Sequence, residues 1–308
     1  MSWESQGAKA RLAVSTNASM TNSNSVWLEM LSENIMRNDT ILNPNGIRGT
    51  RNRSSERNRR GPRAPSGQIV VPLSRIALDN LLPALLGASE SSDTFDTAES
   101  LPTMYAMIDK LTDVFLLSEW TASKGVISGS SGGLLQLALD VEAEDLIEDQ
   151  TFPTATTTFR PDVSSVYQFA DTTTVSLQSA ARNFFGFQIE VDNVLTKGDF
   201  SQGLTRDGTI SAEDRIVRAS FDIQAVTANA DLVEPGLDPA GENVVFTITN
   251  AVTGEDIIIT LGRFSIENAI PTVDGKGRKI IRVQGPVTAY GHPGVTGHVP
   301  DISIVNRL

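Results

Sequence analysis

The sequence predicts a mainly β protein built from two tandem modules, each a β-sandwich or half-barrel unit with a long hairpin, together with one flanking α-helix. Three observations predict this class: an internal repeat, segments in which apolar and polar residues alternate, and one helical segment with an apolar face. The repeat is considered first, because internal duplication fixes the architecture of a chain.

The repeat relates residues 120–143 to residues 264–287. Each segment reads as an apolar strand, a glycine-rich turn and an alternating strand, with the turns at 129–133 and 273–277. After the turns, Leu135, Leu137, Leu139 and Val141 correspond in register to Lys279, Ile281, Val283 and Gly285. Two copies of a β module without evident catalytic residues indicate a protein that builds an assembly.

Composition divides the chain into an N-terminal arm, two modules and a linker. Residues 1–25 are polar and rich in Ser and Asn, and only 10–14 could form a strand, so we expect the rest to order on a partner. The first module spans 26–150, a Thr- and Pro-rich linker spans 151–161, and the second module spans 162–308.

The first module opens with a long hairpin whose strands are expected at 26–37 and 67–73. The connecting loop, 38–66, is dense in arginine, and loops of this length are usually functional or disordered. Its arginines are Arg48, Arg51, Arg53, Arg57, Arg59, Arg60 and Arg63. We expect this loop to be poorly ordered in the isolated chain.

A helix is predicted over residues 74–87. Ser74 is a suitable N-cap and Gly87 a suitable residue just past the C-terminus, while Pro83 predicts a kink or a broken last turn. The apolar face at helical spacing consists of Ile76, Leu78, Leu81, Leu82 and Leu85. Such a helix is expected to lie across a sheet and cover its core.

Further strands and two acidic segments complete the first module. Strands are expected at 105–110, 115–127 and 134–143. The polar, acidic stretch 88–100 is expected to be a surface excursion, and the run 140–149 a solvated acidic edge.

The second module contains another long hairpin, in which strict alternation puts one face on a core and the other in water. Its loop is expected at 194–214. The apolar positions are Phe185, Phe187, Ile189, Val191, Val217, Ala219, Phe221 and Ile223. The polar positions include Gln188, Glu190, Asp192, Arg218, Ser220, Asp222 and Gln224. Other strands are expected at 175–177, 245–249, 257–261, 264–270 and 302–305, and 227–240 would make a poor helix.

Composition excludes several classes of protein. The formal net charge of the 308-residue chain is -12, which argues against a general nucleic-acid binder but not against a protein that keeps nucleic acid at a distance. The chain has no cysteine, so it can form neither disulfides nor thiolate metal sites. Its start lacks a signal-peptide pattern, and no apolar run approaches the ~20 residues that cross a bilayer.

No catalytic, cofactor or metal site is predicted. The segment 129–133 matches G-x-S-x-G, but a nucleophile elbow leads into a helix, whereas this turn leads into an alternating strand. A metal site at His292 and His298 would need a carboxylate such as Asp301, and a polar surface loop is the better interpretation. Gly275-Lys276-Gly277 lacks the Ser or Thr that follows the lysine of a phosphate loop.

The strand Ser66-Gly67-Gln68-Ile69-Val70-Val71-Pro72-Leu73, followed by a Leu-rich helix that ends at Gly87, resembles a signature of the major tail tube proteins of long-tailed, siphovirus-like bacteriophages. The segments 33–53, 187–193 and 215–223 fit the same family, and the likeness covers most of 26–290. The arginine-dense loop and the excursion at 88–100 depart from the pattern.

The resemblance implies a subunit that assembles into rings, and rings that stack into a tube through which genomic DNA passes during ejection. The long hairpins would join into one inner β-barrel, and closing a ring of hairpins removes their unpaired edges. The seven polar hairpin residues Gln188, Glu190, Asp192, Arg218, Ser220, Asp222 and Gln224 would then face the lumen. Acidic walls would repel phosphate and let DNA slide without specific binding.

The resemblance also implies partners. One chain with two modules predicts a trimeric ring with pseudo-sixfold symmetry, and the competing interpretation is one elaborated module per chain and six chains per ring. The arginine loop would dock between rings against acidic surfaces of a neighbour, such as 140–149 or 88–100. Other partners would be the tape measure, tail terminator and distal tail proteins. The protein would be assembled in the host cytoplasm, without a membrane anchor, and reside in the virion.

Alternatives from other classes remain open. A minor tail, baseplate or tail-completion ring protein could use the same fold. A β-sandwich adhesin would usually carry a secretion signal or clustered exposed aromatic residues, and aromatic residues are sparse here. A serine hydrolase is the enzyme alternative, and it rests on the turn at 129–133 alone.

Overall fold

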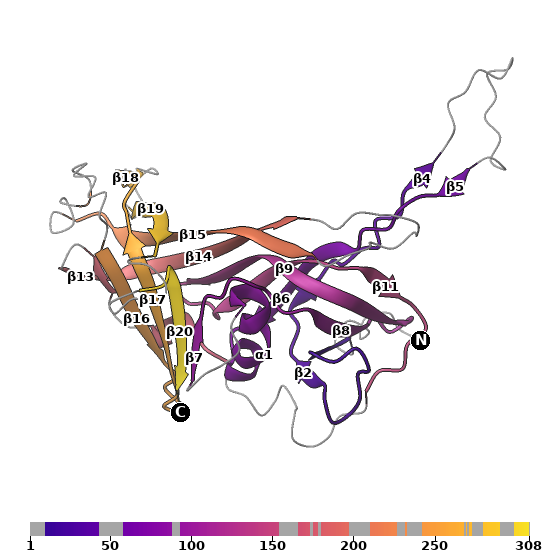
Figure 1. Cartoon of the computed structure of the whole chain (residues 1–308). Helices are drawn as coiled ribbons and strands as arrows, with labels where there is room; N and C mark the ends of the chain where they lie inside the picture. The colour runs from indigo at the N-terminus through magenta and orange to yellow at the C-terminus, as the bar shows by residue number, and fades with distance from the viewer. Residues whose placement is uncertain are drawn as a thin grey trace, which may run out of the picture.

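The described part of the protein is an antiparallel β structure with one long helix, α1, beneath its main sheet (Figure 1). The computed structural model describes residues 10–42, 58–87, 93–153, 166–172, 175–177, 180–196, 210–226, 232, 242–267, 269, 271–272, 280–289 and 299–307. The mainly β class predicted from the sequence is confirmed.

The elements of the first half are β1 (Arg11–Ser15), β2 (Val26–Leu28), β3 (Ser32–Glu33), β4 (Ile41–Leu42), β5 (Arg59–Arg60), β6 (Ser66–Pro72), α1 (Arg75–Leu86), β7 (Thr94–Asp96), β8 (Met104–Asp109), β9 (Val114–Ser130), β10 (Gln136–Glu142) and β11 (Asp145–Ile147). Those of the second half are η5 (Phe169–Asp171), β12 (Val175–Leu177), β13 (Ala180–Arg182), β14 (Phe184–Thr196), β15 (Ser211–Gln224), β16 (Glu242–Thr249), β17 (Asp256–Phe264), β18 (Pro271–Thr272), β19 (Ile280–Thr288) and β20 (Ile302–Arg307).

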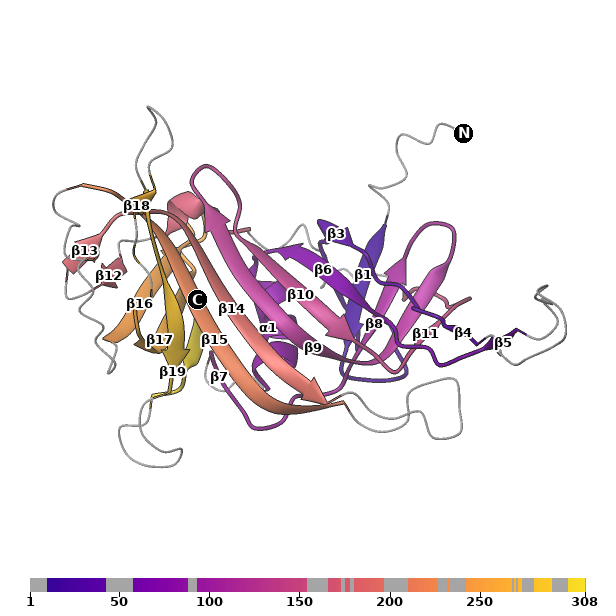
Figure 2. The same ribbon diagram turned by 90° about the horizontal axis from the view of Figure 1, so that it is seen from above.

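We call one run of adjacent strands the main sheet. Its strands lie side by side in the order β3-β6-β10-β9-β14-β15-β19-β18 (Figure 2). Within this order the two halves of the chain meet at the antiparallel pair β9 and β14, in which Ile127 lies opposite Ile189. Both hairpins therefore belong to one continuous sheet.

The two halves repeat the same order of strands. In the first, β6 pairs with β10, β10 with β9, and β9 also with β8 and β11. In the second, β15 pairs with β19, β19 with β17 and β18, and β17 also with β16 and β20. The repeated sequence segments thus occupy equivalent places, which is the arrangement that two tandem modules would produce.

The registers of the two halves also agree. Leu137 lies opposite Val71 and Ile127, and its counterpart Ile281 lies opposite Ile223 and Pro271. The hairpins match in the same way, since the pairs Glu33–Ile69 and Met36–Ser66 correspond to Phe187–Phe221 and Glu190–Arg218.

Helix α1 forms as predicted and covers the underside of the main sheet. The Ser74 hydroxyl accepts a hydrogen bond from the Ala77 N–H, and Gly87 ends the helix in the left-handed conformation with φ 89°. The last turn is not broken at Pro83, since the helix continues to Leu86 and the Gly87 N–H donates to the Pro83 carbonyl at 2.9 Å. Leu85 packs so closely on Gly125 of β9 that a Cβ at that position would overlap its side chain.

One hydrophobic core contains residues from both halves of the chain. In the second half it is dominated by aromatic rings, with Phe187 and Phe221 of the hairpin packed edge-on against Phe246 of β16. A small second cluster of Ala13, Met107 and Phe152 lies apart from the main core.

The structure corrects several boundaries in the first half. The segment 26–37 is not one strand: β2 pairs with β1, and only residues from Leu31 onward bond to β6. Trp27 explains the break, because its ring packs on Phe152 in the small cluster. The possible strand at 10–14, by contrast, is confirmed as β1, whose Leu12 and Val14 lie in the main core.

Other corrections concern polar or irregular segments. The expected excursion at 88–100 contains β7, which pairs with β20 because Phe95 is completely buried. In the second hairpin the alternation shifts at a bulge, so that Phe184 rather than Phe185 is buried. The strand expected at 264–270 is interrupted: β17 ends at Phe264, and Ser265 and Glu267 continue to bond to β19.

Candidate functional site

The upper face of the main sheet carries the polar residues of the second hairpin. Gln188, Arg218 and Gln224 are exposed, and Glu190, Asp192, Ser220 and Asp222 are partly exposed. All seven lie on the face opposite the core, because each alternates with a buried neighbour such as Ile189 or Phe221. We call this surface, formed by the outward residues of β6, β10, β9, β14, β15 and β19, the polar face.

A cluster of polar side chains around Lys124 lies at the middle of the polar face. Lys124 of β9 is directly opposite both Asp140 of β10 and Asp192 of β14. Its ammonium lies 2.8 Å from the Glu190 carboxylate, and this hydrogen bond, more than the other nearby carboxylates, raises the pKa of Lys124. Gln68 of β6 donates to Asp140 at 2.8 Å, so the cluster connects four strands.

The other two cations of the described polar face are also paired. Arg282 of β19 donates two hydrogen bonds to Asp222, at 2.8 and 3.0 Å, and these raise the pKa of Arg282. Arg218 lies 3.4 Å from Glu267. The polar face is therefore less acidic in character than the hairpin alone predicts, but each cation on its described strands is held by a carboxylate.

Beneath the polar face, a buried amide ties the second hairpin to the helix. Asn193 is 2% exposed, and its side-chain amide donates to the carbonyl oxygens of Leu85 at 2.9 Å and Ala122 at 3.1 Å. Leu85 lies in the last turn of α1, whose carbonyl groups lack partners within the helix. The hairpin, β9 and α1 are thereby fixed to one another.

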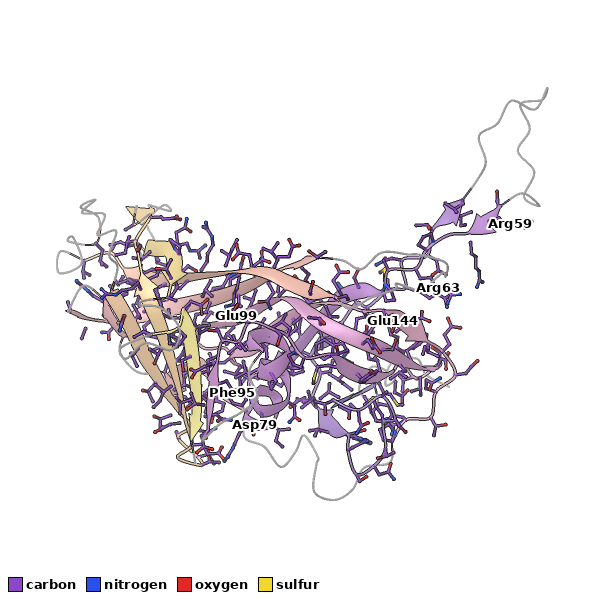
Figure 3. The ribbon with its side chains drawn as sticks, in the orientation of Figure 1. Arg59, Arg63, Asp79, Phe95, Glu99 and Glu144 are labelled. Carbon is purple, nitrogen blue, oxygen red and sulfur yellow. The ribbon has the colours of Figure 1, made fainter. Side chains whose placement is uncertain are left out.

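A second candidate site is the arm, which we define as the described residues 38–42 and 58–66. Its strands β4 and β5 pair through Ile41–Arg60 and Leu42–Arg59 and extend away from the body (Figure 1). Arg59 lies out on the arm, whereas Arg63 lies at its base (Figure 3).

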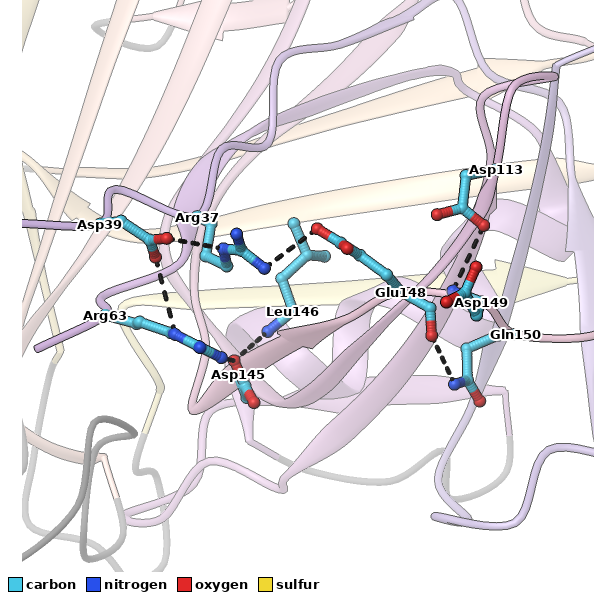
Figure 4. Close-up of polar contacts among 9 residues, drawn as sticks. All are labelled: Arg37, Asp39, Arg63, Asp113, Asp145, Leu146, Glu148, Asp149 and Gln150. Carbon is cyan, nitrogen blue, oxygen red and sulfur yellow. Dashed lines mark hydrogen bonds and ion pairs between the residues drawn. The ribbon is translucent and has the colours of Figure 1, made fainter. Parts of the chain in front are cut away.

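The base of the arm is held by an ion-pair network (Figure 4). Arg37 lies 3.0 Å from Asp39 and 2.9 Å from Glu148, and Arg63 lies 3.8 Å from both Asp39 and Asp145. Two acids of the 140–149 run are thus engaged by arginines of the same chain. Arg63 anchors the arm, and Asp145 and Glu148 already have partners within the chain.

Beyond its base the arm exposes apolar side chains. Ile41 is 71% exposed and Leu42 is 54% exposed, and Arg59 and Arg60 on the facing strand are also exposed. A two-stranded hairpin is at best marginally stable alone, and exposed apolar groups on it indicate a contact surface. Arg48, Arg51, Arg53 and Arg57 lie outside the described residues.

Comparison with known protein families identifies the family of this chain. A family model described as phage tail tube protein matches residues 7–289. The chain belongs to the phage tail tube protein family. No curated protein matches the chain. Membership makes the protein a structural component of the phage tail and of the virion.

The other motifs of this tail tube chain have structural interpretations. The segment 129–133 forms a hairpin turn between β9 and β10, in which the Gly133 N–H donates to the Ser130 carbonyl. Asp301 pairs with Arg215 at 2.9 Å, while His292 and His298 lie outside the described residues. Among the residues that the structure describes, no group of acids or histidines could hold a metal ion, and no helix could cross a membrane.

Sequence reasoning missed two features of the tail tube chain. Lys124 belongs to the repeated β9 segment, and only the pairing of β9 with β14 brings it to Glu190. Ile41 and Leu42 precede the arginine run, and they belong to no periodic pattern that predicts a strand or a helix. The signal that could have identified them is an isolated apolar pair beside a charged loop, which indicates a contact surface.

Proposed function

We propose that this protein is the major tail tube subunit, and that its rings stack into a tube whose lumen conducts the phage genome during ejection. The observation that carries the proposal is the continuous sheet. It joins both hairpins through β10 and β9, and it leaves one polar face uncovered by the described residues. Copies arranged around an axis would close this sheet into a barrel lined by that face.

The charge pattern suits a conduit for DNA. Proteins hold DNA mainly by lysines and arginines that replace the counterions of phosphate. Lys124, Arg218 and Arg282 are all engaged by carboxylates. Asp140, Asp192 and Glu142 add further negative charge to the same face. A wall of this kind would let DNA slide rather than bind it.

The number of chains per ring follows from the number of modules. The equivalent strand orders and registers of the two halves favour three chains per ring with pseudo-sixfold symmetry over six chains. The arm would contact the next ring through Ile41, Leu42 and its exposed arginines. The tape measure protein would occupy the lumen, and the terminator and distal tail proteins would bind the two ends of the tube.

Negative-stain electron microscopy of the purified chain tests this proposal. The expected images show rings with a central opening, and stacks of them in concentrated protein. Single short rings that never stack would instead favour a tail-completion or baseplate ring protein. A chain that stays monomeric at all concentrations and ionic strengths would overturn the proposal.

A further inference from the structure

The main sheet ends in two edges that have no partner strand in the described chain. At one end β3 pairs only with β6, and at the other end β18 pairs only with β19. Unpaired edges attract other strands, so proteins either cover them or use them. The β3 edge corresponds to the edge of β14, and the β18 edge corresponds to the edge of β9.

The pair β9–β14 shows how such edges join within the chain. There Gln188 lies opposite Ser128, and Ile189 lies opposite Ile127. In the first hairpin Ile35 occupies the position of Ile189, since it precedes Met36 as Ile189 precedes Glu190 in matched pairs. Pro271 occupies the position of Ile127, because each lies opposite equivalent residues of β19 and β10.

We propose that the β18 edge of one copy pairs antiparallel with the β3 edge of a second copy, in the register of β9 and β14. Thr272 then lies opposite Asn34, Pro271 opposite Ile35, and Ala269 opposite Arg37. The proposal rests on the ring assembly proposed above and names the surface through which neighbouring chains meet within a ring.

The hydrogen-bonding groups at the centre of this junction are complementary. The Asn34 and Met36 N–H groups bond to β6, so the N–H and carbonyl of Ile35 face the free edge. The Ile35 carbonyl accepts from the Lys110 ammonium at 3.1 Å. Pro271 has no N–H to offer that carbonyl, and none is needed while Lys110 serves it.

The backbone N–H of Ile35 already has a hydrogen-bond acceptor in the single chain. Its N–H donates to the Glu33 carboxylate at 2.9 Å, and the same carboxylate lies 3.0 Å from Lys110. On assembly this N–H transfers from Glu33 to the Pro271 carbonyl. Glu33 and Lys110 thus cap the edge in the free chain, as side-chain charges often protect an edge strand.

A disulfide cross-link tests the register, because the native chain contains no cysteine. Asn34 has its N–H directed to β6, so Asn34 and Thr272 form a non-hydrogen-bonded pair, whose Cα atoms lie ~4.5 Å apart. The test variant is Asn34→Cys with Thr272→Cys, oxidised after assembly. The matched control is Ser128→Cys with Gln188→Cys, which occupies the equivalent positions inside one chain.

The expected product of the test variant is a covalent ladder on non-reducing gels, which ends at the number of chains in the closed ring. The control gives an internal disulfide and no ladder. Arg37→Cys with Thr272→Cys, which is out of register, should give little cross-linking. Rings that assemble without the Asn34–Thr272 link, or that link only the out-of-register pair, would overturn this junction alone. If the native chain forms no rings, the proposed function itself fails.

Discussion

Lys124 is the residue on which the charge balance of the polar face depends. It faces Asp140 and Asp192 and is bonded to Glu190. Like charges opposite one another destabilise strand pairs, and this lysine separates three of them. Lys124 therefore stabilises the junction of β9 with β14. Its ion pair with Glu190 also makes its ammonium less available to phosphate.

Replacement of Lys124 with methionine should lower the free energy of unfolding at pH 7 by about 0.5–1 kcal/mol. Because the bond to Glu190 raises the pKa of Lys124 in the folded chain, its contribution is complete below about pH 10.4. The contribution then fades as the pH rises through the folded-state pKa. Urea denaturation at pH 7 and pH 11 measures this difference. Lys124→Arg is the control, and a loss that is equal at both pH values would contradict the account.

Asn193 should matter far more to stability than its neighbour on the polar face. Asn193→Ala removes two buried hydrogen bonds and leaves the carbonyl groups of Leu85 and Ala122 without that donor. We expect a loss of about 2–3 kcal/mol in thermal or urea unfolding. Asp192→Ala, one residue earlier on the opposite face, should cost less than about 1 kcal/mol. Equal effects would show that the amide does not tie the hairpin to α1.

At the scale of the elements, the arm stands out because its apolar side chains do not pack on the body of the chain. Its base is fixed by Arg37, Asp39 and Arg63, while Ile41 and Leu42 are exposed beyond it. An apolar, basic hairpin held at its base by these ion pairs would present a contact surface to a neighbouring molecule.

The double variant Ile41→Ser and Leu42→Ser should leave folding of the chain unchanged but reduce stacking of rings by tenfold or more, a change of at least about 1.4 kcal/mol. Light scattering follows stacking, and circular dichroism checks the fold. Arg59→Ser with Arg60→Ser should instead weaken the salt dependence of the stacking rate. Normal tube growth by the apolar variant would remove the arm from the inter-ring contact.

The elements that sequence predicted well were those with a strong local signal. Helix α1 has a cap at each end and an apolar face, and the second hairpin alternates strictly over residues 187–193 and 217–223. The predictions were wrong for segments whose structure depends on tertiary contacts. Phe95 recruits a polar stretch into β7, and Trp27 draws β2 away from the first hairpin. The outward position of the hairpin's polar residues followed from alternation, but their ion pairs depend on which strand lies beside them.

At the scale of the whole molecule, the engaged cations of the polar face would set how DNA moves through the tube. The variants Glu190→Gln, Asp222→Asn and Glu267→Gln remove the ion-pair partners of Lys124, Arg282 and Arg218. Virions with these tubes should assemble but release DNA more slowly, with a delay that shrinks as salt increases. Fluorescence of a dye that binds released DNA measures the rate. Unchanged ejection at low salt would contradict a lumen formed by this face.

A cryo-electron microscopy map of assembled tubes tests the central claim most directly. The account predicts three chains per ring, six long hairpins around a continuous barrel, and Glu190, Asp192 and Asp222 facing the lumen. A ring of six chains would contradict the division into two tube modules. The same carboxylates on the outer wall, or β14 and β15 outside the barrel, would contradict the account as a whole.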